Sequence, residues 1–371
     1  MLFGWLKNKS QKKLMENSDK MLTLHEKTIL LQEWQVPPSL SPLNENDLKL
    51  LDEIKRRTLQ LNRNNITRTQ AYLDIYLNHP ELHWAFLAHM VSRNAGWNMT
   101  DLKRHSLSGL MGCDSSSIFF GFLEKGNHLI FLDAFPQLSL YAEGKRQNQD
   151  LSHLLGHIGV SSFMLPFWRL FLKDGGKNSR LLTVSLIINE QSLLQKHVMN
   201  NPYYQEKVLN SLKFQLQEKL GFTQILFPYK HSNAIEITGG TVVNFASLTS
   251  RIEFGKELYM RLFSANQVLP GAVTFGKGTF HSGSRSDYMP EVFSTDAGSL
   301  KVYSPHLEDA WPPYLHKSTK KLEDWFSFDK ANELPGLFTL SCQKDIPNMK
   351  KEHLLNIMQL SSLGEIHKMM T

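Results

Sequence analysis

Charged side chains interrupt several apolar helical stretches of the sequence, and a buried charge needs a partner of opposite sign. In LIINEQ, the carboxylate of Glu190 follows apolar residues that repeat at helical spacing. An arginine can supply the matching charge, because its planar guanidinium binds a carboxylate through two parallel hydrogen bonds. We therefore predict one polar cluster inside a helical body, which either supports the fold or binds a small anion. Its expected members are Arg68, Arg93, Asn94, Asp101 and Glu190.

A second candidate is the stretch HSGSRSDY, which contains His281, Arg285 and Asp287. An imidazole, a guanidinium fork and a carboxylate in a loop are residue types suited to binding an anionic group. A local turn, in which serine and aspartate bond to nearby backbone, explains the same residues. Because the GxSxG motif and its strand-turn-helix context are absent from the sequence, a serine hydrolase is not predicted.

Two other motifs lack the residues or the context that their chemistry requires. GAVTFGK, residues 271–277, fits the GxxxxGK spacing of a phosphate-binding loop, but Gly278 stands where Ser or Thr would hold magnesium. His79 and His83 have the i, i+4 spacing of metal ligands, but no HExxH motif accompanies them. The sequence therefore predicts neither a nucleotide site nor a metal site, and we expect no cofactor.

The charge of the chain gives no strong signal for a nucleic-acid partner. The formal net charge is +6, and the basic residues are spread along the chain instead of forming one long tract. Residues 1–13 combine apolar side chains with lysines, a composition that fits either a weak membrane contact or a frayed terminus.

Cysteine usage and hydropathy point to the cytoplasm. Cys113 and Cys342 have neither disulfide-framework nor zinc-ribbon spacing, which favours a reducing compartment. The apolar stretch 154–172 has nearly the length of a membrane span, but a histidine, a proline and an arginine interrupt it. We expect a buried core helix that begins after Pro166.

Apolar residues at helical spacing predict that most elements of the chain are helices. Strand patterns are confined to residues 222–229 and 234–243, which predict a small hairpin with a Gly-Gly turn. The expected helices span about residues 10–34, 48–61, 67–77, 81–95, 181–194, 209–220, 245–262 and 350–370.

The stretch SRNAGWNMTD, residues 92–101, poses the choice between a helix corner and a site. Gly96 can end one helix in a left-handed conformation, and Asn98 can cap the next one. Trp97 could then fold back on Val91. We interpret the stretch as a tight corner between two helices, with a site as the alternative.

The predicted fold is mainly α: a single multi-helix body with a small β-hairpin and a long loop-rich segment. A proline-rich linker, VPPSLSPLN, separates the N-terminal helix from the body. The loop-rich segment, rich in Gly, Ser and Thr, is expected either as an ordered loop or as a flexible flap. The expected parts are residues 1–43 (N-terminal helix and linker), 44–268 (helical core), 269–330 (loop-rich segment packed on the core) and 331–371 (C-terminal helical segment).

Several blocks of the sequence carry a resemblance to a known family. NRNNITRTQAYLDIYLNHPELHWAFLAHMVSRNAGWNMTDLK, FLDAFPQLSLY, LLTVSLIINEQ, NPYYQ, QILFPY, FASLTSRIEFGKELY and HSGSRSDY follow one another between about residues 48 and 288. In this order they resemble the YppC-like proteins, an uncharacterised family of Bacillus and relatives. The resemblance implies a mainly helical bacterial cytoplasmic protein, and it brings no activity, cofactor or catalytic residue.

We derive three hypotheses for the function from these observations. The first is a non-enzymatic cytoplasmic binding or interaction protein, because no complete catalytic signature is present. The second is an enzyme or ligand-binding protein that acts on a small anionic substrate through the buried Arg/Asp/Glu cluster. The third is a peripheral membrane protein that is attached through residues 1–13.

Overall fold

The computed structural model is mainly helical, as predicted from the sequence. It describes residues 18–36, 40–104, 113–211, 224–316, 322–341 and 346–359. The helices are α2 (Leu24–Gln35), α3 (Glu45–Leu61), α4 (Asn65–Asn78), α5 (His83–Asp101), α7 (Cys113–Gln147), α8 (Leu165–Lys173), α9 (Ser179–Leu194), α10 (Pro202–Tyr204), α12 (Leu248–Phe263), α13 (Val268–Gly278) and α14 (Leu307–Ala310). Residues 350–359 are also helical.

Short strands and tight turns complete the described structure. Two π-turns, η2 (Gln195–Met199) and η3 (Gln205–Leu209), follow α9 and α10. The 3₁₀ segments are η1 (Ser152–Ile158), η4 (Arg285–Asp287), η5 (Phe328–Lys330) and η6 (Leu334–Leu337). The strands are β1 (Ser18–Lys20), β2 (Gln224–His231), β3 (Ala234–Thr241), β4 (Phe293–Ser294), β5 (Val302–Tyr303) and β6 (Thr339–Ser341).

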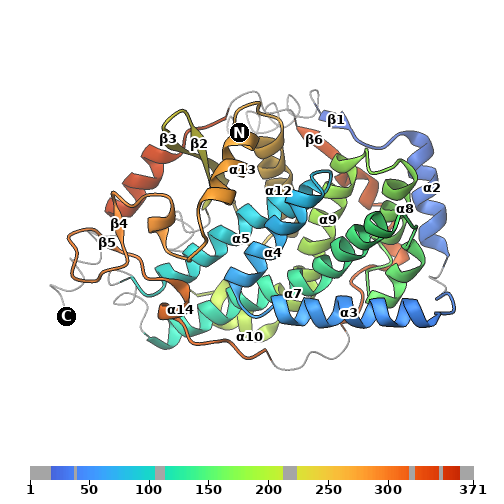
Figure 1. Ribbon diagram of the computed structural model, residues 1–371, viewed down its shortest axis with the longest axis horizontal. Helices are drawn as coiled ribbons and strands as arrows, with labels where there is room; N and C mark the ends of the chain where they lie inside the picture. Colours follow the sequence, from blue (N-terminus) through green and yellow to red (C-terminus); the bar gives the residue numbers. More distant parts are fainter. Residues whose placement is uncertain are drawn as a thin grey trace, which may run out of the picture.

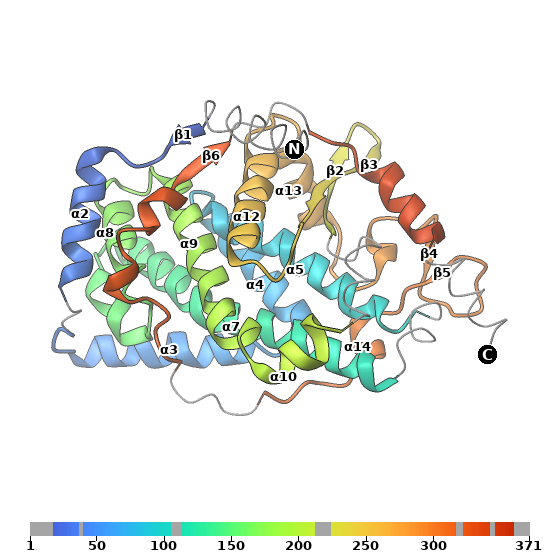
Figure 2. The same ribbon diagram turned by 180° about the vertical axis from the view of Figure 1, so that it is seen from behind.

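Helices α4 and α5 lie side by side in the middle of the molecule (Figure 1). Helix α3 runs along one edge and contacts α7, while α2 and α8 pack together at the end opposite β4 and β5 (Figures 1 and 2). Helices α9 and α12 contact each other and α5 on the side seen in Figure 2. Aromatic side chains such as Phe86, Phe135 and Trp168 fill the core between these helices.

The local sequence explains where helices α3 and α4 begin. Asn44 accepts hydrogen bonds from the backbone of Asn46 and Asp47, and Asp47 accepts one from the backbone of Asn44. Asn64 and Thr67 form the same reciprocal cap at the start of α4. Both caps satisfy backbone N–H groups that have no partner within the helix, and they fix the positions of α3 and α4.

The predicted hairpin is confirmed, but its predicted Gly-Gly turn is wrong. Strands β2 and β3 pair antiparallel, and the chain reverses at Ser232, which has a positive φ of 53°. Gly239 lies within β3 with φ of 143°, where a Cβ would approach the carbonyl oxygen of Ile225 closer than 3.0 Å. Glycine is therefore needed there for a close approach of the two strands and not for a turn.

The helix corner predicted within residues 92–101 is wrong, because α5 continues through Gly96 to Asp101. Asn98 caps no helix, and Trp97 is fully buried, where its ring packs on Tyr288 with ring centroids 4.4 Å apart. Side chains from distant parts of the chain occupy the space beside Gly96. The glycine and asparagine signals in this stretch therefore reflect tertiary packing instead of a helix end.

Two further boundaries differ from the prediction. Helix α2 begins at Leu24, because Thr23 forms a capping box with Glu26, and residues 18–20 pair with β6 instead of extending the helix. The stretch after Leu269, predicted to lack helices, begins with α13, which packs on β2. GAVTFGK lies inside this helix, so it forms no phosphate-binding loop.

Helix α8 begins at Leu165 with Pro166 in its first turn, close to the expected start of a core helix after that proline. Among the described residues, no helix is long and apolar enough to cross a membrane. Residues 1–13, most of the helix expected over 209–220, and the last part of the helix expected over 350–370 lie outside the described residues.

Candidate functional site

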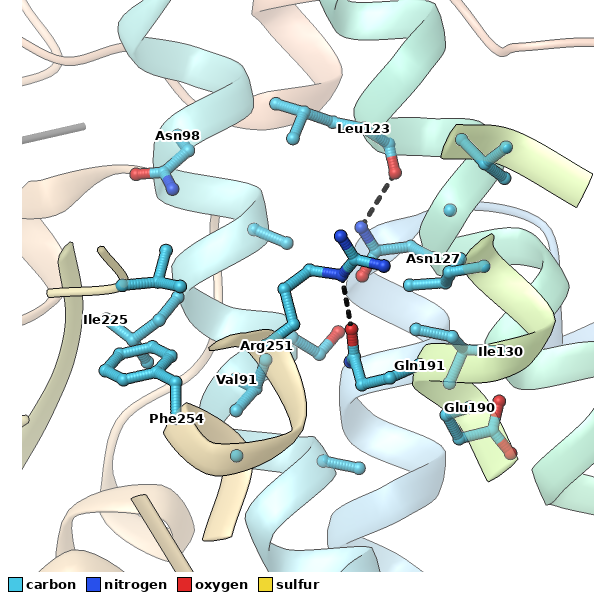
Figure 3. A pocket seen from close by; sticks show the side chains of 18 of the residues that line it. Val91, Asn98, Leu123, Asn127, Ile130, Glu190, Gln191, Ile225, Arg251 and Phe254 are labelled. Carbon is cyan, nitrogen blue, oxygen red and sulfur yellow. Dashed lines mark hydrogen bonds between the residues drawn. The ribbon is translucent and has the colours of Figure 1, made fainter. Parts of the chain in front are cut away.

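A cavity of about 300 Å³ lies among α4, α5, α7, α9 and α12, next to β2 (Figure 3). Most of its lining side chains are apolar, and they include Val91 from α5, Ile130 from α7 and Phe254 from α12. Concave spaces of this size that are lined mostly by apolar side chains and a few polar groups are typical of small-molecule sites.

Helical spacing brings polar side chains into this apolar cavity. On α9, Ile187, Gln191 and Leu194 are three or four residues apart and line the same wall. On α7, Leu123, Asn127 and Ile130 do the same. Each helix thus presents one amide within an apolar stripe, an arrangement that gives a ligand orientation as well as burial.

Arg68 and Arg251 are both cations that line the cavity, but Arg68 pairs with Glu124, whereas the described residues offer Arg251 only neutral oxygens as acceptors. The Arg251 guanidinium donates to Gln191 Oε1 at 3.0 Å, to Gln195 Oε1 at 2.6 Å and to the carbonyl oxygen of Phe245 at 2.7 Å. The residue is 5% exposed, and burial lowers the pKa of its guanidinium to about 10. Among the described residues no carboxylate forms an ion pair with Arg251, so neutral oxygens alone stabilise this buried charge.

The position of Arg251 on its helix strengthens the positive field. It lies in the first turn of α12, which begins after the N-cap residue Ser247. The N-terminus of a helix carries a partial positive charge, so a cation there gains nothing from the helix dipole. An anion in the cavity would be favoured by both the guanidinium and the helix.

The hydrogen bond from Arg251 also orients the Gln191 amide. An arginine can only donate, so the atom it contacts must be the amide oxygen of Gln191. The NH₂ group of Gln191 is then turned away from the guanidinium, and it has no acceptor within the described part of the chain. The cavity therefore offers a neutral donor beside a cation, a combination that suits the oxygens of a carboxylate or a similar group.

One of the two π-turns lines the cavity, and the other packs on a helix that does. The first, η2, contributes Val198 and Met199 to the lining, and its first residue, Gln195, binds Arg251. The second, η3, contacts α7. Such π-turns distort the regular helical hydrogen bonding and occur frequently at functional sites.

Glu190 also lines the cavity, but its carboxylate is turned away from Arg251 (Figure 3). It lies against Asp133 of α7, and burial together with the charge of Asp133 raises the pKa of Glu190 well above its ordinary value. Burial raises the pKa of Asp133 to about 6. Asn189 and Gln137 donate to Asp133 Oδ2, each at 2.7 Å. Burial and the neighbouring Asp133 thus favour the protonated form of Glu190, which can share its proton with Asp133.

We expect the Glu190→Gln variant to lose part of the pH dependence of stability. Both carboxyl groups have folded pKa values above their ordinary values of 3.8 and 4.5. Their stabilisation is therefore fully present at lower pH, and it is lost as the pH rises through the folded values, that of Asp133 being about 6. Glutamine stays neutral and can donate to Asp133 at every pH. Unfolding midpoints in urea, measured from acidic to mildly alkaline pH, should fall less steeply for the variant.

The exposed Glu206 on η3 provides a control for this experiment, because it is far more accessible to solvent than Glu190. Glu206→Gln should leave the slope of stability against pH as it is in the wild type. A wild-type slope that persists in Glu190→Gln would show that the carboxyl pair does not share a proton.

The structure gives separate partners to the predicted cluster residues. Arg68 donates to Glu124 Oε2 at 2.5 Å, and the other oxygen of Glu124 lies 3.0 Å from His316 Nε2. Arg93 donates to the carbonyl oxygens of Gly276 and Thr279 at the C-terminal end of α13. No hydrogen bond or ion pair joins any two of the five predicted residues, although Arg68 and Glu190 both line the cavity.

Asn94 and Asp101 bind different parts of the chain. The Asn94 amide donates to the carbonyl oxygen of Leu226 at 2.5 Å and accepts from the Leu226 N–H at 2.9 Å, so it pairs with β2 as a peptide group would. Asp101 accepts hydrogen bonds from Arg104 at 2.5 Å and from Arg285 at 2.8 Å. The structure thus joins Asp101, from the predicted cluster, to Arg285, from the predicted loop.

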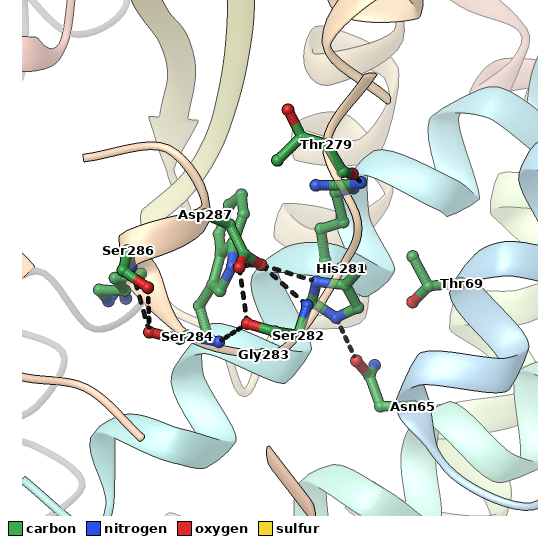
Figure 4. A network of polar contacts seen from close by, with 12 residues as sticks. Asn65, Thr69, Thr279, His281, Ser282, Gly283, Ser284, Ser286 and Asp287 are labelled. Atoms are coloured by element: carbon green, nitrogen blue, oxygen red, sulfur yellow. Dashed lines mark hydrogen bonds and ion pairs between the residues drawn. The ribbon is translucent and has the colours of Figure 1, made fainter. Parts of the chain in front are cut away.

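The loop with His281, Arg285 and Asp287 is buried against α5 (Figure 4). His281 Nε2 contacts Asn65 Oδ1 at 2.7 Å, and its Nδ1 lies 3.6 Å from the Asp287 carboxylate. Asp287 also accepts a hydrogen bond from the Ser282 hydroxyl at 2.6 Å. Arg285 binds Asp101, so the three residues do not converge on one open anion site.

The two histidines with metal-ligand spacing have other contacts. His79 ends α4 and lies 3.9 Å from Glu81, while His83 Nδ1 lies 3.0 Å from the Tyr259 hydroxyl. Burial lowers the pKa of His83 to about 4. Among the described residues, no group of three or more histidine, cysteine, aspartate or glutamate side chains is arranged to hold a metal ion.

Sequence reasoning missed Arg251, Gln191, Asn98 and Glu124. For Arg251 and Glu124 a signal existed, because each is a charged residue within an apolar helical stretch, as Glu190 is. For Gln191 and Asn98 the sequence signal was weak, since asparagine and glutamine are common on exposed helix faces. Only the packing of several helices around one cavity distinguishes them.

Comparisons with known proteins identify relatives of this chain without an assigned activity. A sequence model of a family described as "Protein of unknown function (DUF2515)" matches residues 60–350. The chain is 37% identical over 299 residues to "Uncharacterized protein YppC" of Bacillus subtilis (strain 168), an alignment that covers 79% of this chain and 90% of that protein. No solved structure matches the fold.

Proposed function

The chain belongs to the DUF2515 family, whose description assigns no activity, and from its cavity we propose that the protein binds a small amphipathic anion. Such a ligand has an apolar body and one acidic group. We also propose a cytoplasmic location, which is supported by two cysteines without a pairing pattern.

The single observation that carries this proposal is the guanidinium of Arg251 in an apolar cavity, which pairs with no carboxylate among the described residues. Burying a charge without a partner is costly, and a protein that retains such a charge gains most when an anion binds beside it. The Gln191 amide adds a second donor at the same place. The apolar walls would then bury the remainder of the ligand.

The volume of the cavity limits the size of the ligand. A cavity of about 300 Å³ lies at the lower end of the volumes that small-molecule sites have, roughly 300–1,000 Å³. A medium-chain fatty acid such as decanoate matches this size and has the expected chemistry. We therefore use decanoate as the probe for the class of ligand.

We expect calorimetric titration of the full chain at neutral pH to detect decanoate binding. Butyrate lacks the apolar body, and decan-1-ol lacks the charge, so both should bind more weakly. The Arg251→Gln variant should lose at least about tenfold in affinity for decanoate, because the variant cannot form the charge-assisted hydrogen bonds.

A matched control is Arg169→Gln on α8, where the arginine is 52% exposed and pairs with Glu33 at 2.7 Å. This variant should bind decanoate as the wild type does. The proposal is overturned if the wild type binds none of the three probes, or if decan-1-ol binds as tightly as decanoate and Arg251→Gln changes neither affinity.

A further inference from the structure

Asn98 presents a second polar group to the cavity, apart from the Arg251 guanidinium (Figure 3). Arg285 donates from Nη2 to the Asn98 side-chain oxygen at 3.0 Å. Because an arginine only donates, this contact fixes which end of the amide is the oxygen. The NH₂ group of Asn98 must therefore point away from Arg285.

The NH₂ group of Asn98 has no acceptor among the described residues. Asn98 is only partly buried, and its side chain is part of the lining of the cavity. Apolar neighbours cannot accept a hydrogen bond from this amide. A ligand that supplies an oxygen can, and its binding would be favoured for that reason. The cavity thus contains a donor that a plain hydrocarbon tail would leave unpaired.

The orientation of Asn98 is held by a buried ion pair. Arg285 Nε donates to both oxygens of Asp101, at 3.0 and 2.8 Å, and its Nη1 donates to the Tyr288 hydroxyl at 2.6 Å. The guanidinium has little freedom to turn with three sides engaged, so the Asn98 oxygen stays in place. Asp101 and Arg285, two charged residues predicted as candidates from the sequence, therefore influence the cavity by fixing the orientation of Asn98.

We propose that Asn98 determines specificity by donating a hydrogen bond to an oxygen acceptor, a keto or hydroxyl group, within the apolar tail of the bound acid. Arg285 is the positioning residue for this interaction. The inference rests on the proposed binding of an amphipathic anion and deepens it, since it specifies an oxygenated tail. The ligand class is then a medium-chain acid with an acidic head and an oxygen acceptor within its tail.

The test compares decanoate with decanoate analogues that carry one keto group at successive positions of the tail. A keto oxygen only accepts hydrogen bonds, so it probes the Asn98 donor specifically. Calorimetric titration of the wild type should show that the best keto acid binds about tenfold more tightly than decanoate. In Asn98→Leu this preference should disappear, while decanoate should bind at least as tightly as to the wild type.

Asn98→Asp is a second variant that keeps the contact with Arg285, because an aspartate oxygen can accept the same hydrogen bond. It presents an oxygen to the cavity where the wild type presents NH₂. The keto acid should therefore lose its advantage over decanoate in this variant too. Because its contact with Arg285 is retained, Asn98→Asp tests the proposal even if Asn98→Leu does not fold.

Asn127 provides the matched control, since it is another amide that lines the cavity. Its NH₂ group donates to the carbonyl oxygen of Leu123 at 2.8 Å, so its own oxygen is the end left available. Asn127→Leu should keep the preference for the keto acid. A lysine at position 285 has no planar fork to reach both Asp101 and Asn98, so Arg285→Lys should reduce the ratio of keto-acid affinity to decanoate affinity.

The outcomes separate this inference from the function on which it rests. If decanoate binds in an Arg251-dependent manner but no keto acid binds more tightly, the role of Asn98 is overturned and the proposed function stands. If a keto preference persists in both Asn98 variants, the acceptor is recognised elsewhere and the role of Asn98 is likewise overturned. If neither acid binds to the wild type, the proposed function itself fails.

Discussion

The Asp101→Asn variant is expected to lose about 3–5 kcal/mol of unfolding free energy. Asp101 is 2% exposed, and both Arg104 and Arg285 pair with it. Asparagine keeps the shape of the side chain but removes its charge. Two buried guanidinium groups would then face each other without a carboxylate between them. The measurement is the unfolding midpoint in urea, followed by circular dichroism.

The pH dependence of the same variant tests the electrostatic cause. Burial alone would raise the pKa of Asp101, but the positive charges of Arg104 and Arg285 outweigh it and lower the pKa below the ordinary 3.8. A carboxyl group with a lowered folded pKa stabilises the protein above its unfolded pKa and stops doing so as the pH falls through the folded value. The difference between wild type and variant should therefore be full at neutral pH and shrink below pH 3.8.

Glu33→Gln is the control for the neutral-pH effect. Glu33 pairs with Arg169 at 2.7 Å on the surface, where the two side chains are 29% and 52% exposed. Solvent screens such a pair, so its loss should cost no more than about 1 kcal/mol. Equal costs for Asp101→Asn and Glu33→Gln would contradict a role for burial in the Asp101 network.

Helices could be predicted from this sequence because their signals are local. The apolar spacing along α3, α9 and α12 and the caps at Asn44 and Asn64 lie within a few residues of the helices they define. The hairpin was predictable for the same reason, as each strand has its own pattern. Local signals were sufficient wherever nothing distant competed with them.

Stretches where distant residues decide the structure could not be predicted. Glycine and asparagine in residues 92–101 are the residues of a helix end, yet α5 continues because its surroundings require a glycine and two amides on its surface. The candidate residues Asp101 and Arg285 were recognisable by type, but not as partners of each other, because nothing local links them. Arg251 and Asn98 could not be recognised as candidate binding residues from the sequence, because only the cavity between the helices brings them to one site.

Gly96→Ala is expected to destabilise the protein by about 2–4 kcal/mol, although alanine is the better helix former. A Cβ at Gly96 would come closer than 3.0 Å to Asn65 Oδ1 and to His281 Nε2, which contact each other at 2.7 Å. Neither atom belongs to a flexible surface chain, since both side chains are buried. The methyl group would therefore overpack the site and break that hydrogen bond.

The same substitution at Gly126 provides a control of opposite sign. Gly126 lies within α7, and a Cβ there would meet Leu194 Cδ2 at 3.6 Å, an ordinary van der Waals contact beside the cavity. Gly126→Ala should raise the unfolding free energy by about 0.5–1 kcal/mol, because alanine loses less backbone entropy in a helix. If Gly96→Ala were instead stabilising, as alanine in a solvent-exposed helix would be, the close packing of His281 and Asn65 on α5 would be disproved.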